Sequence, residues 1–373
     1  MSKTTRKLIL FKDYCEKNNN PFLEFSKPRR LALLEQDLFG NYTQFNYGAA
    51  HAFIGSVRNA TVFGSGFILT EDGHCLLHGL TTGNYRNNLQ VQLKKYFIDW
   101  HVNGSIELEI DQNAPILDVE AVLLWGSNNF GHWIFTYLHR LVLLFFLPSL
   151  RDKKILVWDG TPKRFIAWLA KLGIGEESLV YARDCSQVTR LWVPSVLHYR
   201  GHYDDMNVYI FPEAVHIFRH QVLQQRAFVV PYEEKRERIY ISRAKAKWRR
   251  VVNEDELVRR LMERGVRTVY LEELSVDDQI DLVSRAELIV LFAGGAPPVT
   301  MLAPKDASII EMSLPGFSGI FGSRVWAQIL GQKFSRVDAA PVETVGDRPN
   351  AITDRDAIVP IDKVIALVEA VVT

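Results

Sequence analysis

The second half of the chain has the clearest pattern of hydrophobic and polar positions. Short apolar runs alternate there with amphipathic stretches of helical period, which predicts a doubly wound domain around a parallel sheet. Capping patterns agree with this: Asn253 with Glu256 opens one predicted helix, and Ser275 with Asp278 opens the next. The predicted strands are 238–242, 266–271, 287–292, 308–312 and 334–338.

The first half is less regular. Residues 51–110 carry short apolar runs between Gly, Asp and Asn turns, which predicts a β-rich segment. Residues 1–50 are mixed, and we expect helix there in pieces. From about residue 120 strands and helices alternate, which predicts a second unit with a parallel sheet. Its elements are a helix at about 129–147, a strand at 154–160 and a helix at 164–173 that Gly173 ends.

These patterns predict an α/β protein of two facing Rossmann-like domains with a cleft between them and an N-terminal β-rich extension. We expect the boundary at about residue 230, with domains at 1–230 and 231–350 and a last amphipathic helix within 351–373. Ligands of such sheets bind beyond the carboxyl ends of the strands. The loops after residues 242, 271, 292 and 312 are therefore the candidates for a binding site.

Composition narrows the class of protein. The 373 residues are 47% hydrophobic and 23% charged, with a net charge of +1, which excludes a disordered chain and a dedicated nucleic-acid coat. Three separated cysteines are typical of reduced thiols. The N-terminal apolar run is too short for a signal peptide, and the run at 141–150 is too short for a membrane span. We expect a cytoplasmic protein, either free or peripheral to the inner membrane.

One candidate site enters the helix predicted at 129–147. His132, Thr136 and Arg140 share a helix face, with Trp133 on the adjoining apolar side and Ser127 or Asn128 as the N-cap. A histidine beside Asn128 and Asn129 is suited to take a proton from a sugar hydroxyl. The alternative is a structural histidine at the start of a core helix.

A second candidate is the basic stretch 235–250, which holds eight basic residues against Glu237. Arginine suits a diphosphate because its planar fork can bind two oxygens at once. The alternatives are a solvated loop and contact with nucleic acid or anionic lipid.

Two weaker candidates follow later strands. Gly294 and Gly295 let a backbone approach a ligand closely, and Pro298 would open a short helix behind them. Glu311 closes a strand, where it would hold either a ribose or a neighbouring loop. Asp205, in an open loop with His202, is a weak candidate for a base or metal ligand.

Taken together, these segments resemble glycosyltransferase family 61, which includes capsular polysaccharide biosynthesis proteins. The resemblance rests on NNFGHW followed by LHRL, on RIYISR followed by Arg250 and VNEDEL, and on LEELSVDDQI, with a looser likeness at ATVFGSGFILTEDG. It implies a GT-B fold and an inverting, metal-independent transfer from a nucleotide sugar, with the C-terminal domain binding the donor. It also implies that the last helix packs back on the N-terminal domain.

The chain departs from the family pattern in one loop. Where the family reads roughly His-Gly-Ala-Gly-Leu-x-Asn, Gly294 stands for the histidine and Thr300 for the asparagine. His139 also replaces the proline of the Leu-Pro-Arg-Leu motif. These departures put the donor, the base or the activity itself in question.

The function predicted on these grounds is hexosyl or pentosyl transfer from a donor, UDP-linked by expectation, to a glycan, a lipid-linked glycan or a small hydroxylated acceptor. No nucleic-acid partner and no metal are expected. The alternatives are a non-catalytic nucleotide-sugar-binding or scaffold protein and another anion-handling transferase, phosphoryl or ribosyl. The predicted catalytic residues are His132 and Arg243. The predicted donor-binding residues are Ser242, Arg249, Arg250, Asn253, Gly294, Gly295, Ala296, Thr300 and Glu311. The predicted acceptor-side residues are Asn128, Asn129, Trp133, His202 and Asp205.

Overall fold

The structure is a computed structural model, and it forms two compact units. Unit 1 comprises Met1–Leu31 and Tyr47–Ala214, and unit 2 comprises Ala32–Asn46 and Val215–Thr373. The chain therefore changes units after Ala214 rather than near residue 230, and 32–46 belong with the later residues. The structure describes residues 2–27, 29–39, 42–77, 95–101, 105–111, 113–200, 208–225, 236–315, 323–342 and 355–372.

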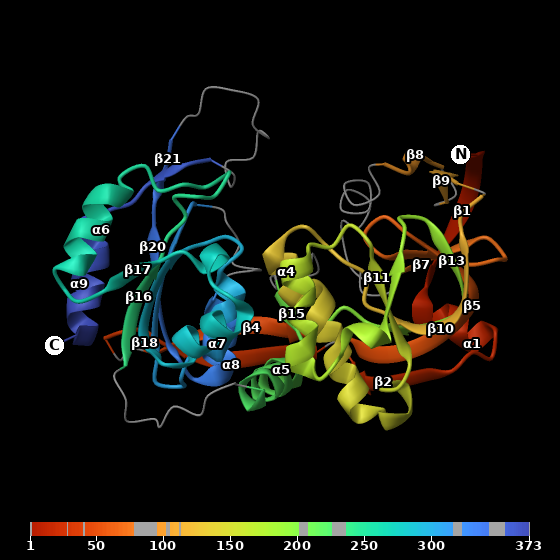
Figure 1. Cartoon of the computed structure of the whole chain (residues 1–373), viewed down its shortest axis with the longest axis horizontal. Helices are drawn as coiled ribbons and strands as arrows, with labels where there is room; N and C mark the ends of the chain where they lie inside the picture. Colours follow the sequence, from red (N-terminus) through yellow and green to blue (C-terminus); the bar gives the residue numbers. More distant parts are fainter. Residues whose placement is uncertain are drawn as a thin grey trace. The chain divides into compact units, whose positions relative to one another are not determined.

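Unit 2 contains a parallel sheet in the strand order β17-β16-β18-β19-β20 (Figure 1). All of the strands predicted for this region are present. The strands are β16 (Glu237–Ile241), β17 (Arg267–Val269), β18 (Ala286–Phe292), β19 (Ser308–Ser313) and β20 (Lys333–Asp338). The connecting and terminal elements are α6 (Glu254–Met262), η6 (Leu271–Glu273), α7 (Val276–Ser284), η7 (Pro297–Leu302), α8 (Arg324–Leu330), β21 (Ala340–Pro341), β22 (Ala357–Ile358) and α9 (Ile361–Val372).

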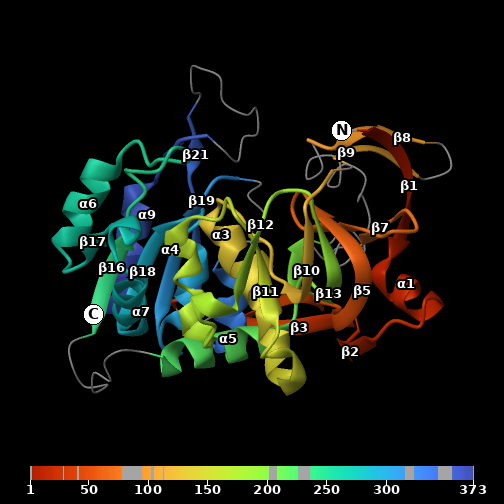
Figure 2. The same ribbon diagram turned by 45° about the vertical axis from the view of Figure 1, so that its right-hand side comes forward.

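Helices cover both faces of this sheet. Figures 1 and 2 show α6 and α9 together on one face and α7 and α8 on the other. Gly265 ends α6 in the left-handed conformation, with φ of 73°, as the sequence predicted. The face under α6 and α9 is apolar, and its buried side chains include Leu257, Leu261, Val290 and Ile310. Burying each such aliphatic side chain stabilises the fold by about 1.5–3 kcal/mol.

The C-terminal helix α9 is part of unit 2. Its buried residues Val364, Ile365 and Val368 belong to the same hydrophobic core as α6 and the sheet. The expectation that 351–373 packs back on the N-terminal domain is therefore wrong for the described residues. The reason is local: α6 leaves an apolar stripe beside it on its own sheet, and the amphipathic α9 covers that stripe.

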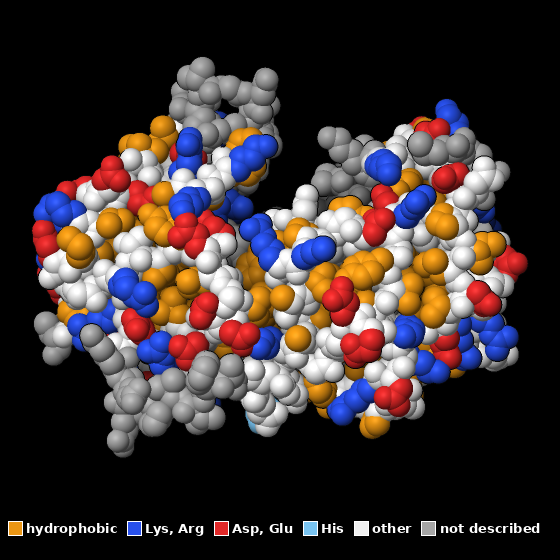
Figure 3. All heavy atoms as spheres, in the orientation of Figure 1, with side chains coloured by type: hydrophobic (Ala, Val, Ile, Leu, Met, Phe, Trp, Pro, Cys, Tyr) orange, Lys and Arg blue, Asp and Glu red, His pale blue; other side chains and the backbone are white. Residues whose placement is uncertain are grey.

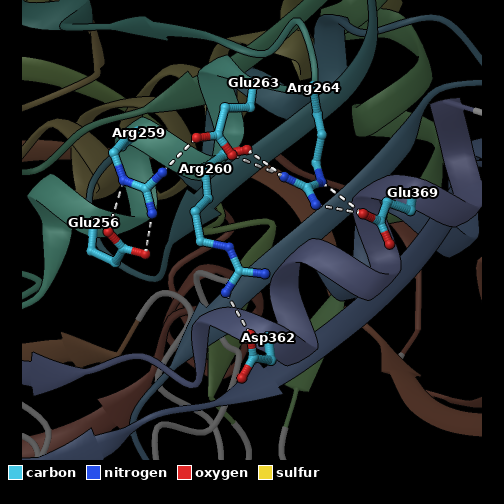
Figure 4. Close-up of polar contacts among 7 residues, drawn as sticks. All are labelled: Glu256, Arg259, Arg260, Glu263, Arg264, Asp362 and Glu369. Carbon is cyan, nitrogen blue, oxygen red and sulfur yellow. Dashed lines mark hydrogen bonds and ion pairs between the residues drawn. The ribbon is translucent and has the colours of Figure 1, made fainter.

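An ion-pair ladder on the surface joins the same two helices (Figure 4). Arg260 pairs with Asp362 at 2.5 Å, and Arg264 pairs with Glu369 at 2.6 Å. Because these pairs are largely exposed, each contributes about 0–1 kcal/mol. The apolar contacts beneath them therefore supply most of the docking energy. The remaining members of the ladder, all on or next to α6, are Glu256, Arg259 and Glu263.

Unit 1 is built on a large mixed sheet in the order β12-β11-β10-β13-β5-β6-β7-β1-β9-β8, with β2 paired to β5. Strands β12, β11, β10 and β13 are parallel, and β5 runs antiparallel to β13. The parallel strands are β10 (Ile116–Leu123), β11 (Lys154–Trp158), β12 (Leu179–Ala182) and β13 (Ser186–Pro194). The others are β1 (Ser2–Leu10), β2 (Phe22–Ser26), β5 (Ala52–Phe63), β6 (Phe67–Leu69), β7 (His74–Leu77), β8 (Phe97–Trp100) and β9 (Ile106–Ile110).

The β-rich character of 51–110 is confirmed over its described residues, whereas residues 1–50 are mostly strand rather than helix in pieces. The only helix among the described residues of 1–50 is α1 (Phe11–Lys17). Two long strands, β3 (Arg29–Gln36) and β4 (Tyr42–Ala49), occupy much of the remainder. Within unit 1 the end of β4 pairs with β15 (Val208–Ile210), which also pairs with β14 (His198–Arg200), and α5 (Pro212–Gln224) follows.

The helix predicted at 129–147 is broken into pieces. A single α-helical turn, α3 (Phe130–His132), leads into a π-helical turn, η1 (Trp133–Tyr137), and then into the 3₁₀ segment η2 (Leu138–Phe146). Gly173 is left-handed, with φ of 74°, and ends the following helical stretch as predicted. That stretch and its neighbours comprise η3 (Pro148–Leu150), α4 (Lys163–Ile166), η4 (Leu169–Leu172) and η5 (Glu176–Ser178).

Candidate functional site

The strand order of unit 2 locates its expected ligand site. Strand β16 lies between β17, which follows it in sequence, and β18, which comes later still. The connection after β16 leads to β17 on one side, and the connection after β18 leads to β19 on the other side, so the topological switch point falls between β16 and β18. In open α/β sheets, ligands bind at the carboxyl ends of the strands at such a point. The segments that follow these two strands begin at Ser242 and Ala293.

Arg243 lies directly after β16, and its guanidinium is held from one side. Its Nε donates to the carbonyl of Arg249 at 3.1 Å, and its Nη2 donates to the carbonyl of Trp248 at 2.8 Å. Burial, followed by the charge of Arg249, lowers the pKa of Arg243 to about 10. The guanidinium is therefore still a cation at neutral pH. Arg249 has a left-handed backbone, with φ of 57°, as the loop folds around the guanidinium.

Gly294, in the loop after β18, touches the same guanidinium. A Cβ atom added at Gly294 would lie 2.7 Å from Cζ of Arg243, closer than carbon atoms can approach. Gly294 is thus required for space rather than for a positive φ. Gly295 and Ala296 continue the loop and are half-buried. Gly294 therefore brings the loop after β18 against the Arg243 side chain, and the role of Gly294 and Gly295 in binding a ligand stays a prediction.

Glu254, in the first turn of α6, joins the end of β16 to the Arg243 loop. One of its oxygens, Oε1, accepts hydrogen bonds from the Tyr240 hydroxyl at 2.6 Å, from Ser242 Oγ at 2.8 Å and from the Arg243 backbone N–H at 3.3 Å. Burial and then the Glu254 carboxylate raise the pKa of Tyr240. The sequence interpretation missed this role. The available signal was the i, i+2 spacing of Tyr240 and Ser242, which puts both side chains on one face of the strand.

Two predicted donor-binding residues instead hold the segment that leads into α9. The Arg250 guanidinium pairs with Asp356 at 2.8 Å, and the Arg250 backbone N–H donates to the same carboxylate. The Asn253 amide donates to the carbonyl of Val359 at 2.8 Å and accepts from its N–H at 3.0 Å. Asn253 precedes α6 but makes no side-chain capping bond. Both side chains are therefore used within the fold, and their assignment to the donor stays a prediction.

Thr300 and Glu311 are also used internally. The Thr300 side chain is fully buried: its hydroxyl donates to the carbonyl of Pro297 and accepts from the Trp326 indole at 2.7 Å. Glu311 is 2% exposed, and its carboxylate accepts from the Ser323 backbone N–H at 2.6 Å. Burial raises the pKa of Glu311. The alternative of a local cap is therefore correct for Glu311, and neither residue is exposed to a donor.

The basic stretch 235–250 does not form a single patch. Arg236 and Arg238 lie at the amino end of β16 and pair with Asp306 and Glu287. At the other end of the strand, Lys245 pairs with Glu273, and its ammonium lies 4.7 Å from the centre of the Tyr270 ring. On the visible face of unit 2, acidic and basic side chains are interspersed (Figure 3). Including Arg250, four of the eight basic residues therefore pair with carboxylates distant along the chain.

In unit 1, the predicted histidine site follows β10. The N-cap is Asn129, whose side chain accepts from the His132 N–H at 3.3 Å, rather than Ser127 or Asn128. The His132 ring lies 3.3 Å from the Thr136 hydroxyl, as the predicted i, i+4 spacing requires. Burial lowers the pKa of His132, which favours the neutral imidazole over the imidazolium.

Other predicted residues near His132 belong to the core. Trp133 is fully buried, and its indole donates to the carbonyl of Phe165 at 2.8 Å, so it is not exposed to an acceptor. Arg140 is also fully buried and donates twice to the carbonyl of Pro194. In Figure 2, α3 and α4 lie side by side beyond β10 and β11, where the Phe130 and Phe165 rings pack 5.4 Å apart. Asn128 is exposed in the loop before them.

Two predicted acceptor-side residues, His202 and Asp205, lie outside the described residues. Within the described part of the chain, no three His, Cys, Asp or Glu side chains gather as metal ligands would. No helix in that part is long and apolar enough to cross a bilayer. All three cysteines are free and buried.

Comparison with known proteins supports a sugar-transferring enzyme. Residues 130–310 match the family model described as Glycosyltransferase 61. This match covers just under half of the chain and confirms the resemblance to glycosyltransferase family 61. A comparison with curated proteins gives no match.

Two solved structures of TibC are similar to this chain. One is a bacterial iron-containing dodecameric glycosyltransferase from enterotoxigenic E. coli H10407, with 11% identity and a TM-score of 0.29 over 78% of this chain and 75% of that one. The other is an iron-containing heptosyltransferase in complex with ADP-D-β-D-heptose, with 10% identity and a TM-score of 0.30 over 87% of this chain and 80% of that one.

Proposed function

We propose that the chain transfers a sugar, with inversion, from a nucleotide-sugar donor to a hydroxylated acceptor, and that Arg243 binds the donor diphosphate. The observation that carries this proposal is the half-buried Arg243 side chain, whose guanidinium is held at the switch point of the unit 2 sheet against Gly294. A cation at this place is suited to a diphosphate. The strand order of unit 2, together with the parallel strands of unit 1, supports the GT-B assignment as part of the same proposal.

The reaction follows from these groups. The acceptor oxygen attacks the anomeric carbon and forms the new glycosidic bond as the bond to the diphosphate oxygen breaks. The acceptor proton passes to a base, and the electron pair of the broken bond remains on the diphosphate. Arg243 stabilises the negative charge that develops there, where a preorganised cation is most effective. Gly294 is buried and Gly295 is half-buried, and because neither has a side chain the loop backbone can come close to a phosphate.

We propose His132 as the base. Its neutral imidazole is held beside Thr136, and Asn129 caps the turn that carries it. Three further assignments rest on the resemblance and remain proposals: a UDP-linked donor, a metal-independent reaction and a cytoplasmic location. Transfer that persists in the presence of a chelator would support the second, and comparison of UDP, GDP and ADP binding would decide the first.

The donor site is tested by replacing Arg243 with alanine. The matched control is Arg238→Ala, which removes an arginine from the opposite end of the same strand. Calorimetric titration with UDP, GDP and ADP should show that Arg243→Ala weakens the best-bound nucleotide about tenfold or more. The control should bind as the unaltered protein does. Equal affinities in both variants would show that the diphosphate does not bind at Arg243.

Catalysis is tested separately. The unaltered protein, incubated with nucleotide sugars and no acceptor, should slowly release free nucleotide, as water replaces the acceptor. His132→Ala should lower this rate while leaving nucleotide affinity unchanged, because the imidazole is proposed to act on the acceptor. A His132→Ala variant with an undiminished rate would exclude the histidine as base.

A further inference from the structure

We propose that Glu254 is a positioning residue, which acts through Arg243 to set the affinity for the donor diphosphate. This inference rests on the proposed function, and its test separates the two. Glu254 is 7% exposed and lies in the first turn of α6, behind the Arg243 loop. It has no assigned part in binding or chemistry.

The contacts of Glu254 determine where the Arg243 backbone lies. Oε1 accepts hydrogen bonds from the Tyr240 hydroxyl at 2.6 Å, from the Ser242 hydroxyl at 2.8 Å and from the Arg243 backbone N–H at 3.3 Å. Ser242 Oγ also accepts the backbone N–H of Ala244 at 3.1 Å. One carboxylate oxygen therefore fixes the chain on both sides of Arg243.

The far end of the Arg243 side chain is fixed independently. The carbonyls of Trp248 and Arg249 accept from its guanidinium, and Gly294 lies against its other side. With both ends held, the guanidinium has one available position. Releasing the backbone end would let the loop 243–250 shift, and the guanidinium would move with it.

The charge of Glu254 has its own effect. Oε1 accepts three hydrogen bonds, whereas the amide oxygen of a glutamine has two lone pairs and is a weaker acceptor than a carboxylate. Burial and then Arg249 lower the pKa of Arg243, and Tyr240, Glu272 and Glu254 act in the opposite direction. A carboxylate here therefore serves both the placement and the charge of Arg243.

The test compares four proteins: the unaltered chain, Glu254→Gln, Arg243→Ala and the double variant. Glu287→Gln is the matched control, because Glu287 is also paired with an arginine at the same sheet, but at its amino edge. The probes are UDP, GDP and ADP, titrated by calorimetry. Far-UV circular dichroism and thermal unfolding establish that each variant is folded.

We expect Glu254→Gln to weaken binding of the best-bound nucleotide about fivefold or more, and Glu287→Gln to leave it unchanged. In the Arg243→Ala background, Glu254→Gln should have no further effect, because its effect passes through the guanidinium. If Glu254→Gln does not fold, Ser242→Ala replaces it in the same cycle, since that change removes the hydroxyl that joins Glu254 to Ala244.

Every other outcome contradicts either the positioning role of Glu254 or the proposed donor site at Arg243. If Arg243→Ala weakens binding and the Glu254→Gln or Ser242→Ala variant does not, the positioning role is wrong and the proposed function stands. If the loss is equally large without Arg243, Glu254 acts on the fold or on the ligand directly, and the positioning role is again wrong. If Arg243→Ala itself has no effect, both the donor site and this inference are wrong.

Discussion

Replacing Gly294 with alanine should displace the Arg243 guanidinium from the carboxyl end of the unit 2 sheet. The added Cβ would lie 2.7 Å from Cζ of Arg243, against about 3.5–4.0 Å for carbon atoms in contact. The guanidinium must therefore retreat by about 1 Å. The two carbonyls that accept from it at 2.8 and 3.1 Å lie on the side away from Gly294, so the guanidinium can retreat only if it turns or the loop 243–250 moves, and at least one of these bonds is then lost.

The size of the effect follows from that bond. A hydrogen bond from a charged donor contributes about 1.5–3 kcal/mol. A ligand that binds the guanidinium in its original position has to return it there against the new methyl group. The free energy of the lost hydrogen bond is therefore subtracted from the binding free energy. We expect a nucleoside diphosphate to bind about ten- to a hundredfold more weakly. Stability should change less, since the displaced guanidinium can be hydrated.

Calorimetric titration with UDP, GDP and ADP measures the effect, and Gly265→Ala is the control. Gly265 has a positive φ of 73° and open space around it, so alanine there should lower stability by about 1 kcal/mol and leave nucleotide affinity unchanged. Undiminished affinity in Gly294→Ala would refute the reasoning, because it would mean that the position of the guanidinium does not matter for binding.

Three further predictions concern stability. Thr300→Val should lower the unfolding free energy by about 1–3 kcal/mol in urea titrations, because it leaves a buried indole N–H without its acceptor, with nucleotide affinity unchanged. Burial lowers the pKa of His139 and of His198 to about 3, so both stay neutral in the folded state and take up protons on unfolding below pH 6.5. Stability should therefore fall between pH 6.5 and 3, by up to about 1.4 kcal/mol per pH unit for each histidine, and His139→Phe should reduce the slope. Arg264→Ala should lower the free energy of unfolding by about 1 kcal/mol or less, and high salt should reduce the difference from the unaltered protein. A loss of several kcal/mol would contradict the conclusion that apolar contacts hold α9 on the sheet.

The strands of unit 2 could be predicted because their signal is local. A strand buried on both faces needs a continuous apolar run. The run 287–292 can be recognised from the sequence without knowledge of the strands and helices that pack against it. The glycines that end helices carry a local signal as well: Gly265 and Gly173 adopt the left-handed conformation that such positions favour. The family motifs are similarly contained in short segments, and the match over residues 130–310 confirms the resemblance that they indicated.

The functions of individual side chains near these strands depended on distant partners. Arg250 and Asn253 are in the basic loop and at its helix, but both bind residues 106 positions away. Thr300 is a loop residue in the sequence, and Trp326 helps to bury it. Pairings at such separations leave no periodic signal, because they depend on which surfaces the fold brings together.

The sequence by itself determined the alternation of strands and helices, the resemblance to glycosyltransferase family 61 and the segment that holds the basic donor candidate. Only the tertiary structure decided which of its cations remains at the switch point of the sheet. Arg236, Arg238 and Arg250 acquire carboxylate partners elsewhere in unit 2. Arg243 is instead enclosed by carbonyls, the Glu254 network and a glycine that leaves it room. The physical reason is that charge compensation and close packing depend on distances in space, which the order of residues does not specify.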